Sequence, residues 1–173
     1  MTAPELSRIV RLDTIRSAPR AERVEADATE RAALARRFGL IALDALSGEL
    51  TLVRDGDEVT LSGRLRAQAT QACVASGAPV PAEIDEPIAL VFRPVPAGDP
   101  DEESELGEAE MDVVFHDGAA IDIGEAVAQS LALALDPYPR APEAEAALRQ
   151  AGVKSEAEAG PFGALAALKE KKE

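Results

Sequence analysis

The chain has 173 residues, and its 32 Asp and Glu against 18 Lys and Arg give a formal net charge of −14. Such a charge is repelled by phosphate backbones, so it excludes non-specific coating of nucleic acid. It either serves solubility alone or favours a basic partner. The single cysteine, Cys73, excludes an intramolecular disulfide and a zinc site built from thiolates.

No apolar run reaches the roughly 18 residues that a membrane-spanning helix needs. The first residues carry Glu5, Arg8, Arg11 and Asp13 where a secretory signal would need an apolar stretch. We therefore expect a cytoplasmic protein with no membrane partner.

The N-terminal part predicts one strand and one helix. Residues 6–15 alternate imperfectly between apolar and polar side chains, which indicates a strand. Asp27 and Glu30 have the spacing of a capping box, and Gly39 stands where a C-terminal glycine is expected. These signals predict a helix over 27–38.

The middle of the chain is the clearest β region. Asp55 and Gly56 form a hairpin-turn dipeptide before a run over 59–70 that alternates almost without fault. Within that run, Gly63 predicts a bulge or a sharp coil. A further strand follows over 84–92 and ends at Pro94.

The C-terminal part begins with residues 97–110, an acidic stretch that we expect to be a mobile loop. A short strand over 111–115 precedes a turn at 116–118. Asp122 then caps a helix with Glu125 as its capping partner, and the apolar stripe of that helix ends before Pro137. Shorter helices are expected over 142–150 and 161–169.

This element order predicts an α+β fold in which an antiparallel sheet, able to curl towards a barrel, packs with a few helices. Residues 1–140 would form a single domain that includes the acidic loop, and 141–173 would form a helical tail. The sequence leaves the oligomeric state open.

Few residues suggest catalysis. His116 stands alone in a polar turn and is expected to be exposed, while Cys73 lies between small apolar residues and is expected to be a packed thiol. Asp122 and Glu125 read better as a helix cap than as paired catalytic carboxylates. No phosphate loop or nucleotide fingerprint is present, so we expect a non-enzymatic protein without metal or cofactor.

Arginines offer one route to RNA. Arg64 and Arg66 share the polar face of the long strand, and Arg8 and Arg11 would extend them into a strip if the first strand paired with the long one. Aromatic residues that stack on bases are missing from these strands. Direct RNA binding therefore stays an alternative, and DNA is not an expected partner.

Two stretches resemble the YceD family, the large ribosomal RNA subunit accumulation proteins, in the form found in alphaproteobacteria. Residues 61–92 resemble the family's segment G-x-x-x-A-x-x-x-Q-x-C-V followed by its P-V-x-x-x-I-D-E-P strand. Residues 121–142 resemble its I-D-L-G-E helix, which ends in L-x-L-D-P-Y-P-R-x-P, and 161–169 resemble its closing P-F-x-x-L-x-x-L-K. Relatives often carry additional cysteines, which this chain lacks, so no metal site is carried over.

The resemblance implies an accessory role in ribosome biogenesis, in support of large-subunit (23S) ribosomal RNA. The partner would be a basic ribosomal protein, an assembly factor or a precursor particle. Our candidate contact is the rigid segment of Asp136, Pro137, Tyr138, Pro139 and Arg140, since tyrosine and arginine are favoured at interfaces. A helix stop with a packed tyrosine explains the segment equally well. A small-ligand or metal-dependent enzyme is the least favoured alternative.

Overall fold

The structure is a computed structural model that describes residues 4–95 and 112–153. The predicted acidic loop at 97–110 and the predicted helix at 161–169 lie outside the described residues. By its contacts the chain divides into two compact units. Within the described parts, the first unit holds 4–70, 81–95 and 112–135, and the second holds 71–80 and 136–153.

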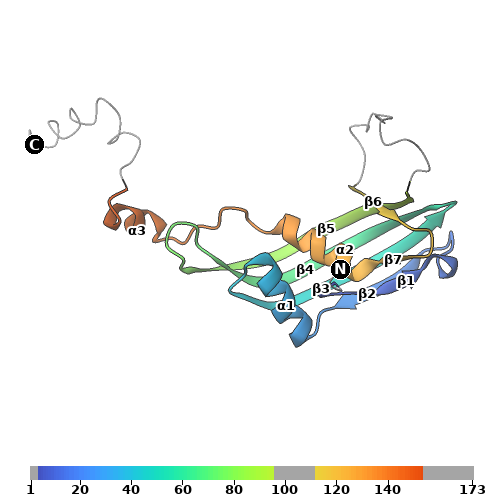
Figure 1. Ribbon diagram of the computed structural model, residues 1–173, viewed down its shortest axis with the longest axis horizontal. Coiled ribbons are helices and arrows are strands. Elements are labelled where there is room, and N and C mark those ends of the chain that lie inside the picture. The colour runs from blue at the N-terminus through green and yellow to red at the C-terminus, as the bar shows by residue number, and fades with distance from the viewer. Residues whose placement is uncertain (1–3, 96–111, 154–173) are drawn as a thin grey trace, which may run out of the picture. The chain divides into compact units, whose positions relative to one another are not determined.

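The described residues form two sheets (Figure 1). The larger has five strands in the order β2-β3-β4-β5-β6, and the smaller pairs β1 with β7. The bounds of the five strands are β2 Arg20–Glu25, β3 Ala42–Asp55, β4 Glu58–Ala72, β5 Pro79–Pro94 and β6 Asp112–His116. β1 spans Ile9–Arg11 and β7 spans Ala120–Asp122. The helices and sheets together confirm the predicted α+β class. Within the described residues, β2 and β6 are the edge strands of the larger sheet, so this sheet is not closed into a barrel.

The predicted hairpin joins β3 to β4. Asp55 pairs with Glu58 across a turn in which Gly56 has φ of 60°, a conformation that favours glycine. Along β4 the alternation predicted from the sequence is confirmed, because Val59, Leu61 and Leu65 are buried while Arg64 is exposed between them. One face of this strand therefore supplies the core and the other faces solvent.

Gly63 has a different role from the predicted bulge. It pairs with Leu50 in unbroken register, and the irregularity of the β3–β4 ladder lies instead between Leu43 and Ala45. A Cβ atom at position 63 would lie 2.1 Å from the carbonyl oxygen of Glu49. Glycine is therefore needed there because the backbone of β3 approaches too closely for any side chain.

Two further strand predictions were wrong in part. β6 runs parallel to β5, in register from Leu90 with Asp112 to Pro94 with His116, so the sheet is mixed and not purely antiparallel. The predicted strand over 6–15 is β only at Ile9–Arg11 and then forms a 3-10 turn at Leu12–Thr14. That short strand pairs with β7 and not with β4.

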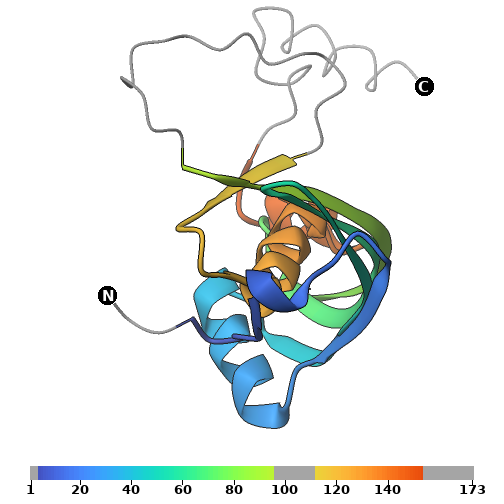
Figure 2. The same cartoon turned by 90° about the vertical axis from the view of Figure 1, so that its right-hand side faces the viewer.

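Two helices complete the first unit. α1 (Ala28–Phe38) has the predicted capping box between Asp27 and Glu30 and ends at Gly39 in the left-handed conformation. α2 (Ile123–Ala134) buries its apolar stripe in the core, and the sheet curls around it (Figure 2). A Cβ atom on Gly48 of β3 would lie 3.0 Å from Val127, so small residues on the sheet permit this close approach.

The second unit is small. Cys73, Ala141 and Ala144 are buried together, with Ala78 and Val80 packed against them. α3 (Ala144–Gln150) confirms the predicted helix in this region. The unit thus joins the segment between β4 and β5 to the chain that follows α2.

Candidate functional site

The segment 136–140 is held to the segment 71–80 by hydrogen bonds at both of its ends. The side-chain amide of Gln71 donates to the carbonyl of Asp136 at 2.8 Å. The backbone N–H of Val74 donates to the carbonyl of Pro139 at 2.9 Å. Residues 71–80 and 136–142, which belong to the two motifs that resemble the YceD family and are far apart in the chain, thus lie in one unit.

The segment also fixes its own conformation. The N–H of Tyr138 donates to the carboxylate of Asp136 at 2.9 Å, which closes an Asx turn across Pro137. Each proline fixes its own φ, and Pro139 is buried. Little conformational entropy is left to lose when a partner binds such a segment.

Tyr138 and Arg140, which belong to this rigid segment, have exposed side chains. Tyr138 is 74% exposed, so the alternative of a packed tyrosine does not apply. Val74 and Arg140 are also exposed in the same unit, and the backbone of Val74 contacts Pro139, which stands between Tyr138 and Arg140. Within the described part of the chain Arg140 forms no ion pair. We call Val74, Tyr138 and Arg140 the knuckle surface.

Arg64 and Arg66 have a different environment. The guanidinium of Arg64 pairs with Asp85 on β5, and this contact holds the pKa of the Asp85 carboxyl below its usual range. Arg66 contacts Glu49 on β3 at 3.3 Å and Asp85 at 3.5 Å. Both charges are therefore balanced by neighbours on the same face of the sheet.

The proposed arginine strip does not form. β1 pairs with β7, so it does not bring its arginines beside β4. Arg8 forms a two-nitrogen ion pair with Glu30, at 2.7 and 2.9 Å, and Arg11 pairs with Asp13 at 2.6 Å. Each of these arginines serves a local contact of the first unit.

His116 is buried, with 7% of its surface exposed, which corrects the expectation of a solvated turn residue. Its Nδ1 accepts the N–H of Gly118 at 3.0 Å, and its Nε2 lies 3.3 Å from the carbonyl oxygen of Asp57. This pattern fits an imidazole that carries its proton on Nε2 and links the β3–β4 turn to the end of β6. The sequence offered no signal for this, because Asp57 is distant in the chain.

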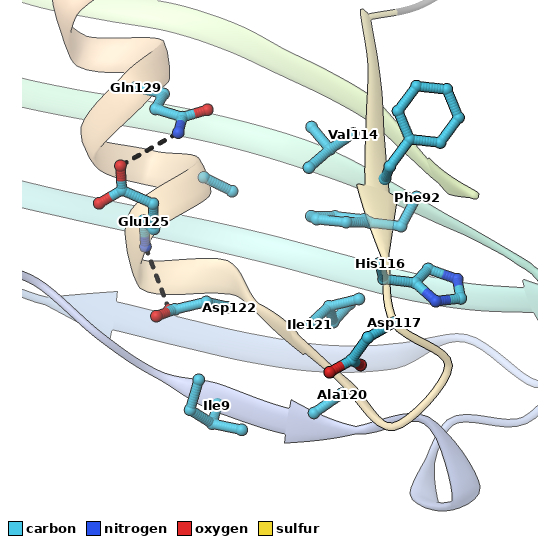
Figure 3. A pocket seen from close by; sticks show the side chains of 12 residues that line it. Ile9, Phe92, Val114, His116, Asp117, Ala120, Ile121, Asp122, Glu125 and Gln129 are labelled. Atoms are coloured by element: carbon cyan, nitrogen blue, oxygen red, sulfur yellow. Dashed lines mark hydrogen bonds between the residues drawn. The ribbon is translucent and has the colours of Figure 1, made fainter. Parts of the chain in front are cut away.

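A groove of about 410 Å³ lies between β6, β7 and α2 (Figure 3). Phe92, Ile121 and Ala126 are buried residues of its wall, and Asp122 and Glu125 lie along its α2 side. Sequence reasoning missed the groove, since its lining comes from five separate elements.

The two α2 carboxylates are occupied by structural contacts. Asp122 accepts hydrogen bonds from the N–H groups of Gly124, Glu125 and Arg8 and from the hydroxyl of Ser7. It caps α2 as predicted. Glu125, however, does not return the cap.

Both carboxylate oxygens of Glu125 bind Arg37 of α1, at 2.7 and 2.9 Å, and Gln129 donates to one of them at 3.0 Å. The guanidinium is the main cause that lowers the pKa of Glu125. The carboxylate is thus held ionised between two helices, which suits a structural tie better than proton transfer.

Cys73 is buried as expected, with 3% of its surface exposed. The pKa of its thiol is lowered to about 7, chiefly by the backbone N–H of Ala141 and then by the hydroxyl of Ser76. The thiol therefore sits among hydrogen-bond donors inside the second unit.

Among residues 4–95 and 112–153, no group of His, Cys, Asp and Glu could hold a metal ion. No described helix is long and apolar enough to cross a membrane.

The fold is that of an α+β protein, and most of the ionised side chains described above form ion pairs within the chain. The family model for the large ribosomal RNA subunit accumulation protein YceD matches residues 61–169. This match covers more than half of the chain, and the chain belongs to the YceD family. The family is described by ribosomal RNA accumulation and not by a reaction. No curated protein and no solved structure matches the chain.

Proposed function

We propose that this protein is a cytoplasmic, non-catalytic accessory factor of ribosome biogenesis that supports accumulation of large-subunit ribosomal RNA. It acts by binding a basic ribosomal protein, an assembly factor or a precursor particle through the knuckle surface of Val74, Tyr138 and Arg140. Family membership supports the link to ribosomal RNA.

The observation that carries the proposal is the exposed Tyr138 on a rigid backbone. An exposed tyrosine that is held by an Asx turn and by a neighbouring segment has the properties of an interface anchor. Its hydroxyl and ring would gain contacts on binding, and the frame loses little freedom. The charge of −14 further favours a basic partner over bare RNA.

Direct RNA binding is the second candidate. The environment of Arg64 and Arg66 disfavours it. The pairing of Arg64 and Arg66 with Asp85 and Glu49 leaves little positive potential on that face. RNA binding would also be steeply weakened by salt, because it depends on counterion release. Salt dependence therefore separates the two candidates.

The experiment is affinity purification of the tagged full-length protein from growing cells, with the eluate assayed for large-subunit RNA and ribosomal proteins at low and high salt. We expect large-subunit components to be recovered at both salt concentrations. Recovery only at low salt would favour direct RNA binding, and recovery of nothing above background would contradict the proposal.

Paired variants make the test specific to the knuckle surface. Tyr138→Ala with Arg140→Ala is expected to abolish recovery at high salt. Leu133→Ala with Arg149→Ala removes one exposed apolar side chain and one exposed arginine elsewhere, so it serves as the matched control. Equal loss from both double variants would contradict a role for the knuckle surface.

A further inference from the structure

The groove beside β6 has the dimensions of a binding site and an apolar wall. Its volume of about 410 Å³ falls within the range of ligand pockets. Phe92, Ile121 and Ala126 are each almost fully buried behind its surface. In Figure 3 the side chains of Phe92, Val114 and Ile121 lie in the space between β6 and α2.

Two large apolar side chains of the lining are left in solvent. Phe115 is 56% exposed and Ile9 is 63% exposed, although both line the groove. They come from different strands, β6 and β1, and both belong to the same lining as the buried Phe92, Ile121 and Ala126. A partner that covered this surface would remove apolar area from water on association.

The Asp, Glu, Lys and Arg residues that line the groove are all acidic. The lining contains the carboxylates of Asp117, Asp122 and Glu125 and no Lys or Arg side chain. Asp122 is engaged as a helix cap and Glu125 is paired with Arg37. Asp117 uses one oxygen for the N–H of Ala119, and no described residue donates to the other oxygen. Asp117 therefore adds to the largely apolar lining one carboxylate oxygen that no described residue contacts.

We propose that this groove binds a basic segment of a partner protein by taking up one large apolar side chain while flanking cations face Asp117. The lining offers RNA no Lys or Arg, and Asp117, which forms no ion pair with a described residue, repels phosphate. A second copy of this chain would bring another charge of −14. Catalytic use of the groove is disfavoured because the two α2 carboxylates are held by structural contacts. The inference goes beyond the proposed function and does not depend on the knuckle surface.

The probe is the peptide acetyl-Lys-Lys-Phe-Lys-Lys-amide, titrated into the ¹⁵N-labelled full-length chain and followed by amide chemical shifts. Two control peptides replace Phe by Ser or all four Lys by Glu. We expect saturable shifts at the amides of Phe115, Ala120 and Gln129 with the first peptide only.

Variants of the exposed rim test the same claim without disturbing the core. Phe115→Ser and Ile9→Ser are each expected to raise the dissociation constant at least about threefold, since each removes apolar contact area. Asp117→Asn keeps the contact to Ala119 and is expected to raise the dissociation constant about two- to fivefold. Leu133→Ser and Asp44→Asn are the matched controls and are expected to change nothing, because neither residue lines the groove.

The proposal is overturned if the serine or glutamate peptide binds as well as the first peptide, or if the first peptide causes no saturable shifts. It is also overturned if the shifts map away from the groove or if the rim variants bind like the controls. Because this assay uses no ribosomal component, its failure is distinct from failure of the affinity purification.

Discussion

Gln71 donates its side-chain amide to the carbonyl of Asp136 across a sequence separation of 65 residues. Gln71 itself is buried, with 9% of its surface exposed. It positions the start of the segment that carries Tyr138, just as Val74 positions its other end. The position of Tyr138 in the knuckle surface thus depends on the hydrogen bond between Gln71 and Asp136.

Gln71→Ala should loosen this segment. The substitution leaves the Asp136 carbonyl without its donor, which we expect to lower the free energy of unfolding by about 1–2 kcal/mol. Hydrogen exchange should accelerate at the amides of Val74 and Tyr138. Gln68→Ala, at an exposed position of the same strand, is the control and should change neither quantity. Unchanged exchange at Tyr138 in Gln71→Ala would contradict this role.

Arg37→Gln should remove the tie between α1 and α2. At pH 7 we expect a loss of about 1–2 kcal/mol in the free energy of unfolding, because a partly shielded two-nitrogen ion pair is broken. The Glu125 pKa is lowered in the folded state, so this stability is present above pH 4.5 and is lost as pH falls through the folded value. Urea unfolding of both proteins from pH 7 to pH 3 should show the difference shrinking.

Arg36→Gln provides the charge control for this experiment. Arg36 is exposed on the same helix, so its loss should cost much less than the loss of Arg37. A difference between wild type and Arg37→Gln that stays constant down to pH 3 would show that the Glu125 pair is not its source.

Gly63→Ala should be strongly destabilising. The new Cβ would lie 2.1 Å from the Glu49 carbonyl oxygen, so the backbones of β3 and β4 must separate. We expect a loss of roughly 3 kcal/mol or more, measured by denaturant unfolding. Ser62→Ala on the same strand is exposed and should have little effect. Similar stability of the two variants would mean that the strands are not this close.

The Cys73 thiol predicts a pH dependence above neutrality. Its pKa is about 7 in the folded state against an ordinary value of 9.0. A lowered pKa contributes stability that is fully present above the unfolded value and is lost as pH falls through the folded value. The free energy of unfolding of the wild type, relative to Cys73→Ala, should therefore rise between pH 7 and pH 9. A constant difference over this range would show that the thiol has the same pKa in the folded and unfolded states.

Local signals in the sequence were sufficient for much of the fold. The cap at Asp27, the turn at Gly56 and the alternation along β4 each depend on neighbours within a few residues, and the structure confirms them. β2 was missed because its sequence Arg-Ala-Glu-Arg-Val-Glu is mostly charged, as suits a strand at a sheet edge. Its one buried side chain, Val24, gives little periodic signal.

Features that depend on long-range pairing could not be predicted in the same way. The parallel alignment of β6 with β5 and the burial of His116 against Asp57 both join distant segments. Arg64 and Arg66 looked like free cations because Asp85 and Glu49 lie on other strands. The segment 136–140 was identified as a candidate contact, but its attachment to Gln71 and Val74 required the structure.

The most direct test of the central claim is to measure large-subunit ribosomal RNA, relative to small-subunit RNA, in cells whose only copy carries Tyr138→Ala and Arg140→Ala. The variant protein is first shown to be present at the wild-type level, with Leu133→Ala and Arg149→Ala as the control. We predict reduced accumulation of large-subunit RNA in the Tyr138 and Arg140 variant alone. Normal accumulation with normal protein levels would contradict a role for the knuckle surface in the function of this protein.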